Sequence, residues 1–151
     1  MPSRQRQTAD AIATAFNTMD IATIISLRSP TCLRQILPAS LAYPPQTNAQ
    51  YEAQLQAMSS IFSAFKITVD DVIEDVEQRK IAMFVRAEGQ TPIGVYNNQY
   101  VWRMEFDEAG EKVDMWTEFV DVGMVRDFYP RLVGEMKRRA EEAERKESGG
   151  G

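Results

Sequence analysis

Apolar residues recur at helical spacing near the start of the chain. Thr8 can cap a first helix that ends near Asn17. The apolar face of this helix would consist of Ala11, Ile12, Ala15 and Phe16. Asp20 can cap a second, short helix over 21–28, which breaks where a serine precedes a proline. The pattern therefore predicts two helices before the first break.

A third helix follows after an irregular stretch. Three prolines fall within 31–45, and each removes a backbone donor, so we expect irregular chain or a short strand there. Asn48 then opens a helix that the apolar stripe carries through residue 65. The stripe consists of Tyr51, Leu55, Met58, Ile61 and Phe62.

Beyond residue 65 the period changes from helical to alternating, which is typical of β-strands. Turn residues separate four alternating runs, and the last turn is "DEAGEK" at 107–112. The predicted strands cover 66–78, 79–89, 94–107 and 113–122. Because consecutive runs are joined by short turns, they predict an antiparallel, meandering sheet.

The order of elements predicts an α+β fold. Gly123 releases the chain into a last amphipathic helix, in which Pro130 marks the start or a kink. A strongly curved antiparallel sheet would wrap around the N-terminal helices and leave an internal cavity where it curls. We predict one domain over 1–138 and a charged, flexible tail over 139–151.

The charge and apolar pattern disfavour nucleic-acid and membrane partners. The formal net charge is -5, and no long basic cluster offers a surface for phosphates. No apolar run reaches the roughly 18 residues of a membrane span, and the first residues lack a signal-peptide core. Cys32 is the single cysteine, so no internal disulfide can form. We expect a cytoplasmic protein.

Histidine is absent from the chain. This absence removes Ser-His-Asp and Cys-His catalysis and any histidine metal ligand. The phosphate-binding signatures GxGxxG and GxxxxGK[ST] are also missing, and the carboxylates show no metal-ligand spacing. Acid–base chemistry would therefore fall to carboxylates, tyrosines, lysines or groups supported by arginine, and we expect no metal or nicotinamide cofactor.

The stretch "YNNQYVWRM" places polar and aromatic side chains on one face of a predicted strand. Side chains alternate along a strand, so this face carries Tyr96, Asn98, Tyr100 and Trp102. Purely apolar residues continue the same face, which suits a cavity with a packed bottom. The alternative is an ordinary half-buried strand face, since tyrosine and tryptophan are favoured there in any case.

Glu118 lies deep in a hydrophobic run of the last predicted strand. Trp116 and a valine flank it on the same face. A buried carboxylate must be paired, hydrogen-bonded or shifted in pKa, and such environments produce catalytic bases. The alternative is a glutamate at the edge of the sheet, in contact with solvent.

Two arginines precede these strands. Arg28 could lie over the cavity mouth and hold an oxyanion or orient Glu118, or it could be a surface arginine at a helix C-terminus. Arg34 is near in sequence and offers the same chemistry. The residues alone leave both roles open.

Several segments together resemble one protein family. The order of elements, the segment "LRSPTCLRQILPASLAYPPQTNAQYEAQLQAM" at 27–58, the helix "QAMSSIFSAF" and the strand "WTEFVD" resemble the NTF2-like superfamily and its SnoaL-like members. The spacing of Arg28, Cys32 and the "LPASL" segment at 37–41 is similar to that of small fungal members encoded beside polyketide, meroterpenoid and prenylated-indole-alkaloid pathways. Many relatives carry a histidine where this chain has Arg34.

The resemblance implies roles for particular residues. The catalytic residues would be Glu118 as base, Arg28 for charge stabilisation, and Tyr96 or Tyr100 as proton donor. Arg28 is favoured over Arg34 because it stands where the fungal pattern has its arginine before the cysteine. The substrate-binding residues would be Trp102, Trp116, Asn98 and Arg34.

The resemblance also implies a function and a partner. It points to a cofactor-independent isomerase of fungal secondary metabolism that converts a 3-hydroxyindolenine alkaloid to a spiro-indoxyl by a semipinacol-type rearrangement. Such a protein would bind a hydrophobic, alkaloid-like small molecule and would form a homodimer. Two alternatives stay open, because one fold hosts many functions: a polyketide or meroterpenoid cyclase or isomerase, and a non-catalytic NTF2-like ligand-binding domain.

Overall fold

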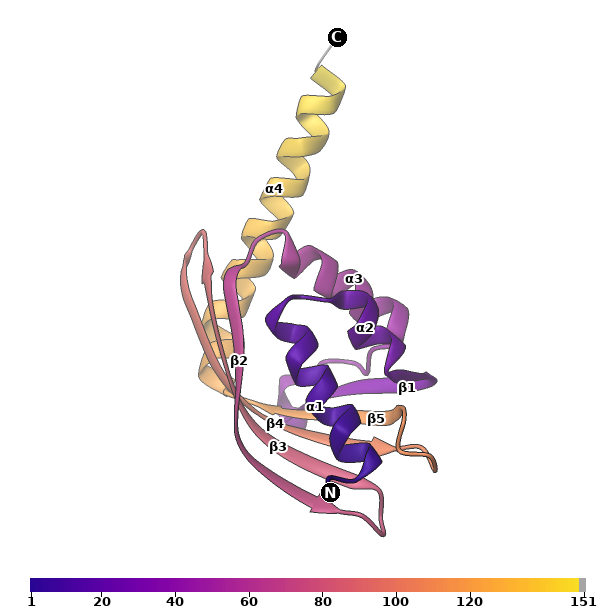
Figure 1. Ribbon diagram of the computed structural model, residues 1–151. Coiled ribbons are helices and arrows are strands. Elements are labelled where there is room, and N and C mark those ends of the chain that lie inside the picture. The colour runs from indigo at the N-terminus through magenta and orange to yellow at the C-terminus, as the bar shows by residue number, and fades with distance from the viewer. Residues whose placement is uncertain (150–151) are drawn as a thin grey trace.

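A computed structural model describes residues 1–149, in which the first three helices pack against the concave side of one curved sheet (Figure 1). The predicted α+β class is confirmed. The elements are α1 (Arg4–Asn17), α2 (Ile21–Ser26), β1 (Arg28–Leu37), η1 (Ala39–Leu41), α3 (Asn48–Ser59), β2 (Ser63–Asp75), β3 (Lys80–Thr91), β4 (Gly94–Phe106), β5 (Val113–Val120), η2 (Met124–Phe128) and α4 (Tyr129–Gly149).

The five strands form one unclosed sheet in the order β1-β5-β4-β3-β2. The strands β2 to β5 pair in antiparallel fashion with their neighbours, as predicted. The strand β1 differs, because it pairs in parallel with β5. Register shifts interrupt the β2–β3 and β4–β5 pairings, and such irregularities bend strands. The bent sheet partly encloses the space that the helices fill.

The strand β1 is longer and more regular than the sequence predicted. Pro30 lies where the register of the β1–β5 pairing is interrupted, between Arg28 and Leu33. Pro38 follows directly after the strand. Because β1 is also an edge strand, a missing backbone donor costs little there. The prolines therefore bound the regular part of β1 instead of preventing it.

The first helix begins earlier than predicted. Ser3 is its cap, since the Ser3 hydroxyl accepts a hydrogen bond from the Arg6 backbone N–H at 3.1 Å. Thr8 lies within the helix, so the prediction that it caps α1 is wrong. The Thr8 hydroxyl instead donates to the Gly110 carbonyl at 2.6 Å and ties α1 to the turn between β4 and β5. The predicted end at Asn17 is confirmed.

The caps of the next two helices follow local sequence signals. Asp20 caps α2, as predicted. A capping box at the start of α3 joins Thr47 and Gln50, each of which accepts a hydrogen bond from the backbone of the other. The helix ends at Ser59 instead of residue 65, so Phe62 belongs to the connection into β2.

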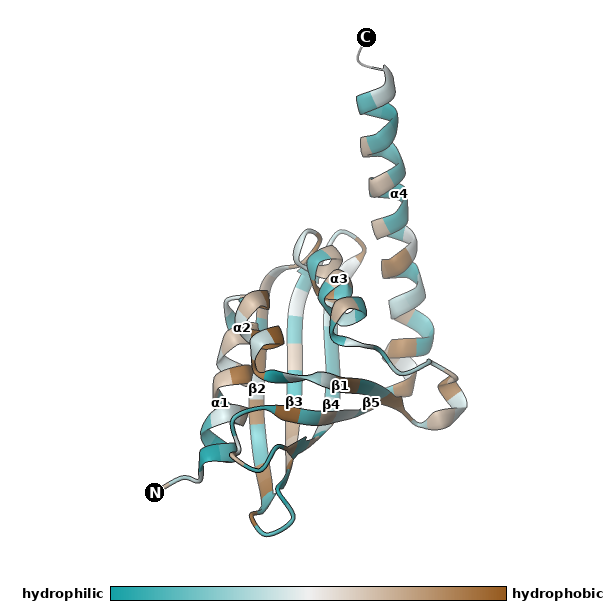
Figure 2. Cartoon of the chain, turned by 90° about the vertical axis from the view of Figure 1, so that its right-hand side faces the viewer, coloured by the Kyte–Doolittle hydropathy of each residue, from teal (hydrophilic) through white to brown (hydrophobic). Residues whose placement is uncertain are grey.

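The C-terminal part begins with one π-helical turn, η2, which continues into α4. Pro130 is the second residue of α4 and follows the π-helical turn directly, so its missing backbone N–H falls inside a continuous helical segment, next to the irregular turn. The helix projects away from the body, and its far end is mostly hydrophilic (Figures 1 and 2). The described part of the predicted tail over 139–151 is thus helical, its flexibility stays a prediction, and residues 150–151 lie outside the described residues.

The core lies between α1 and the sheet. Ile12 and Phe16 of α1 are buried, and the Phe16 ring packs against Trp102 of β4 with ring centroids 5.4 Å apart. Trp102 in turn packs against Trp116 of β5 at 4.9 Å. This aromatic layer closes the bottom of the space under α3. Within residues 1–149, no helix combines the length and apolar character needed to cross a bilayer.

Candidate active site

A cavity of about 240 Å³ lies between α3, the C-terminal helical segment and the concave face of the sheet. All five tyrosines of the chain line it, which are Tyr43, Tyr51, Tyr96, Tyr100 and Tyr129. Within the described part of the chain, Glu118 and Arg34 are the only charged side chains that line it. The cavity is therefore an aromatic space with one ion pair in its wall.

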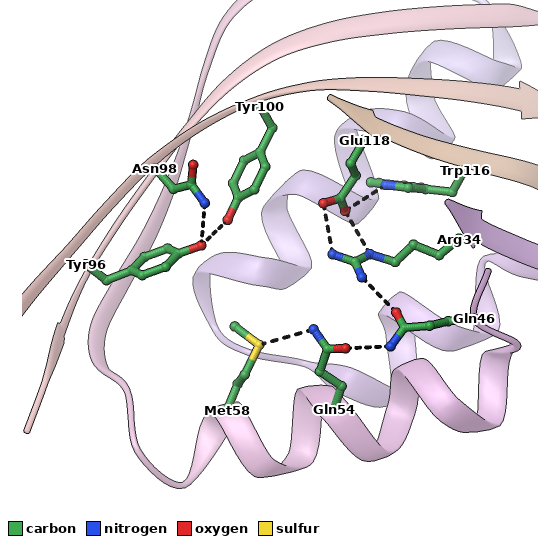
Figure 3. A network of polar contacts seen from close by, with 9 residues as sticks. All are labelled: Arg34, Gln46, Gln54, Met58, Tyr96, Asn98, Tyr100, Trp116 and Glu118. Atoms are coloured by element: carbon green, nitrogen blue, oxygen red, sulfur yellow. Dashed lines mark hydrogen bonds and ion pairs between the residues drawn. The ribbon is translucent and has the colours of Figure 1, made fainter. Parts of the chain in front are cut away.

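Glu118 and Arg34 form a bidentate ion pair. Arg34 Nε donates to Glu118 Oε1 at 3.0 Å, and Arg34 Nη2 donates to Oε2 at 2.9 Å (Figure 3). The Glu118 side chain is 3% exposed and the Arg34 side chain 10%. Trp116 Nε1 adds a third donor to Oε1 at 2.9 Å. Because Oε1 accepts two hydrogen bonds and Oε2 one, Oε2 has the lone pair that is free for a ligand.

The parallel pairing of β1 with β5 brings the two charges together. Arg34 is paired with Trp116 in the register, and Glu118 follows two residues later on the same face of β5. The Arg34 guanidinium also stacks on the Tyr51 ring, 4.6 Å from its centroid. Burial disfavours the charged form of Arg34, but the charge and hydrogen bonds of Glu118 together with Tyr51 and Tyr100 outweigh this effect and raise the pKa of the guanidinium. Arg34 is thus a permanent cation.

The strand β4 supplies two phenol groups that are hydrogen-bonded to each other, those of Tyr96 and Tyr100. Asn98 Nδ2 donates to the Tyr96 hydroxyl at 2.8 Å. The Asn98 amide is oriented by its other end, since Oδ1 accepts from the Gln99 backbone N–H. Burial raises the pKa of both phenols, that of Tyr100 well above its usual range. Both hydroxyls therefore remain protonated at neutral pH and can donate.

Two glutamines complete the polar wall, and sequence reasoning missed both. Arg34 Nη1 donates to Gln46 Oε1 at 2.7 Å, and Gln46 Nε2 donates to Gln54 Oε1 at 2.6 Å (Figure 3). Gln54 stands on the same face of α3 as Tyr51, Leu55 and Met58, at the spacing i, i+3, i+4, i+7. A polar residue within that apolar stripe was the available signal for Gln54.

Arg28 does not contact Glu118 and does not line the cavity. The structure gives the pairing with Glu118 to Arg34, contrary to the preference for Arg28. Arg28 is paired with Val113 at the far end of β1, and its Nε donates to Asn48 Oδ1 at 2.9 Å. Its guanidinium lies over the Tyr51 ring at 5.0 Å, so Tyr51 contacts both arginines. The cause of the difference is the extended course of β1, which separates the two arginines along the sheet.

The remaining predicted residues divide between the cavity wall and the layer behind it. Asn98 and Trp102 line the cavity together with the two tyrosines of β4. Trp116 lies behind the ion pair and supports Glu118 without lining the cavity. The predicted common face of β4 is confirmed, since Tyr96, Asn98 and Trp102 are all buried.

No protein-family model matches the chain, whereas individual relatives do. The chain is 31% identical over 113 residues to "Monooxygenase AacuP" of Aspergillus aculeatus, a match that covers 75% of this chain and 78% of that protein. It is 28% identical over 110 residues to "Austinoid biosynthesis clusters protein H" of Penicillium brasilianum, with 70% and 75% covered. The sequence relatives thus include fungal proteins of biosynthetic clusters.

Solved structures share the fold. The BvnE pinacolase from Penicillium brevicompactum superposes with a TM-score of 0.82 at 22% identity, covering 87% of this chain and 92% of that chain. An NTF2-like protein of unknown function from Burkholderia pseudomallei superposes with a TM-score of 0.69 at 14% identity, covering 83% and 97%. The chain therefore has the NTF2-like fold, and it belongs to one family with the fungal protein AacuP.

Proposed function

We propose that this protein is a cofactor-independent isomerase of fungal secondary metabolism. The proposed reaction is a semipinacol-type rearrangement of a 3-hydroxyindolenine alkaloid to a spiro-indoxyl. One observation carries the proposal: a carboxylate held by an arginine and a pair of phenol donors face the same aromatic cavity. This rearrangement needs an acceptor for a hydroxyl proton and a donor for an imine nitrogen.

The reaction assigns one step to each group. Glu118 Oε2 takes the proton of the C3 hydroxyl, and the migrating carbon moves from C3 to C2 with its bonding electrons. The C3–O bond becomes a carbonyl, while the indolenine nitrogen receives a proton from Tyr100 or Tyr96. One proton leaves oxygen and one arrives at nitrogen, so substrate and product are isomers and no oxidant is consumed. The proton on Glu118 then returns to the tyrosinate, which restores both groups for the next turnover.

Arg34 takes the role that the family resemblance implied for Arg28. Its guanidinium keeps one N–H on each terminal nitrogen beyond the bonds to Glu118 and Gln46, and these can stabilise negative charge on the substrate oxygen. The raised pKa values of the two phenols favour a late proton transfer to nitrogen. The aromatic walls, including Trp102, limit attack by water during migration.

Turnover of a defined substrate tests the proposal. The protein is first dialysed against a chelator and then incubated with a 2,3-disubstituted 3-hydroxyindolenine. The product should be an indoxyl of equal mass, with one enantiomer in excess. Some relatives are named monooxygenases, so a parallel assay without oxygen is needed. Equal rates with and without oxygen support isomerisation, whereas a product heavier by one oxygen atom that forms only in air contradicts it.

A second candidate keeps the cavity and changes the substrate. Relatives are named for the austinoid and the atranone clusters, which favours a broader range of substrates in this family. In a polyketide or meroterpenoid cyclase or isomerase, the same Glu118 would abstract a proton from carbon. A panel of such substrates, assayed beside the hydroxyindolenine, distinguishes the two candidates. Saturable binding without any product would instead indicate a ligand-binding domain.

The proposed assembly is a homodimer formed through the outer face of the sheet. A row of apolar residues crosses four neighbouring strands there in direct register, formed by Leu37, Phe119, Val101 and Phe84. Phe84 is 40% exposed and Phe119 52%. Large apolar residues that adjoin one another on a surface are typical of protein interfaces, which supports a second copy as the partner.

A further inference from the structure

Arg34, Gln46 and Gln54 are joined in that order by two hydrogen bonds, and the donors and acceptors of both bonds are fixed by Arg34. A guanidinium has donors and no acceptor, so Gln46 must present its oxygen Oε1 to Arg34. The Gln46 amide nitrogen then points away and donates to Gln54 Oε1 at 2.6 Å. Both amides are therefore oriented by Arg34, and neither can be reversed without placing two donors or two acceptors in contact.

This direction leaves the Gln54 amide nitrogen at the end of the chain of hydrogen bonds. Gln54 lines the cavity, and its Nε2 has only a 4.0 Å contact to the Met58 sulfur. A thioether is a weak acceptor, so the Gln54 NH₂ group retains its capacity to donate to a ligand. Figure 3 shows Gln54 on α3, on the opposite side of the drawn site from Tyr100.

The surroundings of Gln54 indicate what kind of acceptor it would bind. Apolar side chains of α3 and β2 line the cavity together with Gln54, namely Leu55, Met58 and Phe65. The positive charge of Arg34 is already matched by Glu118. A neutral amide donor in an apolar wall suits an uncharged acceptor, because an anion buried there would have no cation to pair with.

We infer that Gln54 Nε2 binds a neutral carbonyl oxygen of the substrate, at a point remote from the reacting carbon. The substrate class is thereby narrowed to ring systems that carry a ketone, lactone, ester or lactam group. The inference deepens the proposed function and rests on it for the identity of the cavity as a substrate site. Gln46 is then a positioning residue: its oxygen accepts from Arg34, and its amide nitrogen therefore donates to Gln54 and fixes the orientation of the Gln54 amide.

Two probes that differ only in the carbonyl group test this inference. The ketone 4-(indol-3-ylmethyl)cyclohexanone and the hydrocarbon 3-(cyclohexylmethyl)indole have no hydroxyindolenine and cannot rearrange. Their dissociation constants are measured by equilibrium dialysis with the full chain and with the variants Gln54→Met, Gln54→Glu and Gln56→Met. Gln56 is an exposed glutamine of the same helix and serves as the matched control.

The expected result is a selective loss. Gln54→Met should raise the dissociation constant of the ketone by about tenfold, which is the scale of one lost hydrogen bond. The dissociation constant of the hydrocarbon should stay within about twofold of the wild-type value. Gln54→Glu, which presents an acceptor to the carbonyl, should weaken the ketone at least as much. Gln56→Met should change neither. In difference infrared spectra, the ¹³C-labelled carbonyl stretch should move to lower frequency in wild type and return in Gln54→Met.

A ratio of ketone to hydrocarbon affinity that is the same in wild type and Gln54→Met overturns the inference, as does failure of wild type to bind the ketone. The outcome of the hydroxyindolenine assay does not depend on the outcome of these binding measurements. Turnover without the selective loss would remove the carbonyl site and keep the isomerase. The selective loss without turnover would keep the carbonyl site and remove the semipinacol reaction.

Discussion

Arg34 donates two hydrogen bonds to Glu118, from Nε to Oε1 and from Nη2 to Oε2, across the parallel pairing of β1 and β5. Both side chains are almost fully buried. Removal of one partner from a buried pair leaves an uncompensated charge, so the site is coupled to folding as well as to chemistry. Variants of this pair must therefore be assayed at temperatures where they are folded.

Glu118→Gln should lower turnover by about 10²-fold or more, because the amide keeps the size of the side chain but cannot take the proton. Single-turnover rates on the hydroxyindolenine provide the measurement. Glu88→Gln changes an exposed glutamate of β3 in the same way and should have no effect. An unchanged rate in Glu118→Gln would leave the reaction without its proposed base.

Arg34 and Arg28 should differ in what they affect, in the reverse of the order expected from the sequence. Arg34→Gln should lower turnover by about 10²-fold, since the cavity loses the one cation that residues 1–149 place in its wall. Arg28→Gln should mainly lower the midpoint of thermal unfolding, because Arg28 contacts Asn48 and Tyr51 but does not itself line the cavity. The comparison requires kcat on folded protein together with thermal melts. Equal losses of kcat in both variants would contradict the assignment.

Tyr100→Phe should slow turnover more than Tyr96→Phe. Tyr100 pairs with Val120, two residues along β5 from Glu118, whereas Tyr96 lies beyond this pairing. Tyr100 is therefore the phenol nearer to the proposed base, and the loss of its hydroxyl should cost about tenfold or more. Enantiomeric excess should be measured with the rate. Wild-type values in both variants would indicate that this face of β4 only packs.

Tyr51 should make the protein less stable in alkaline solution. Burial raises the pKa of Tyr51 from 10.0 to about 12. A folded-state pKa above the unfolded value contributes stability that is fully present below pH 10 and lost as the pH rises toward 12, about 3 kcal/mol in total. Urea unfolding between pH 9 and pH 11.5 should show this fall for wild type and a smaller fall for Tyr51→Phe. Parallel curves for the two proteins would rule it out.

Phe119→Glu should convert the proposed dimer to a monomer, because it places a charge in the centre of the outer apolar row. Sedimentation velocity at micromolar concentrations gives the mass directly. Asp114→Asn, a change at an exposed position of the same strand, should leave the assembly unchanged. A wild-type protein that sediments as a monomer across this range would contradict the dimer.

Local sequence patterns were sufficient to predict most helices and strands, the shared face of β4 and the burial of Glu118. The alternation in 94–106 placed Tyr96, Asn98 and Tyr100 on one face, because the two-residue period of a strand needs no knowledge of its neighbours. The apolar residues around Glu118 likewise indicated a buried carboxylate, and it is 3% exposed.

Only the tertiary structure decided which partner that carboxylate has. The choice of Arg34 over Arg28 depends on β1 forming a full strand that pairs in parallel with β5, a contact between segments far apart in the chain. The prolines around this strand suggested irregular chain, since their effect depends on whether the strand lies at an edge or in the centre of a sheet. The tertiary structure also decided the place of Gln46 and Gln54 in the site. Arg34 orients the Gln46 amide by a hydrogen bond, and Gln46 orients the Gln54 amide in the same way.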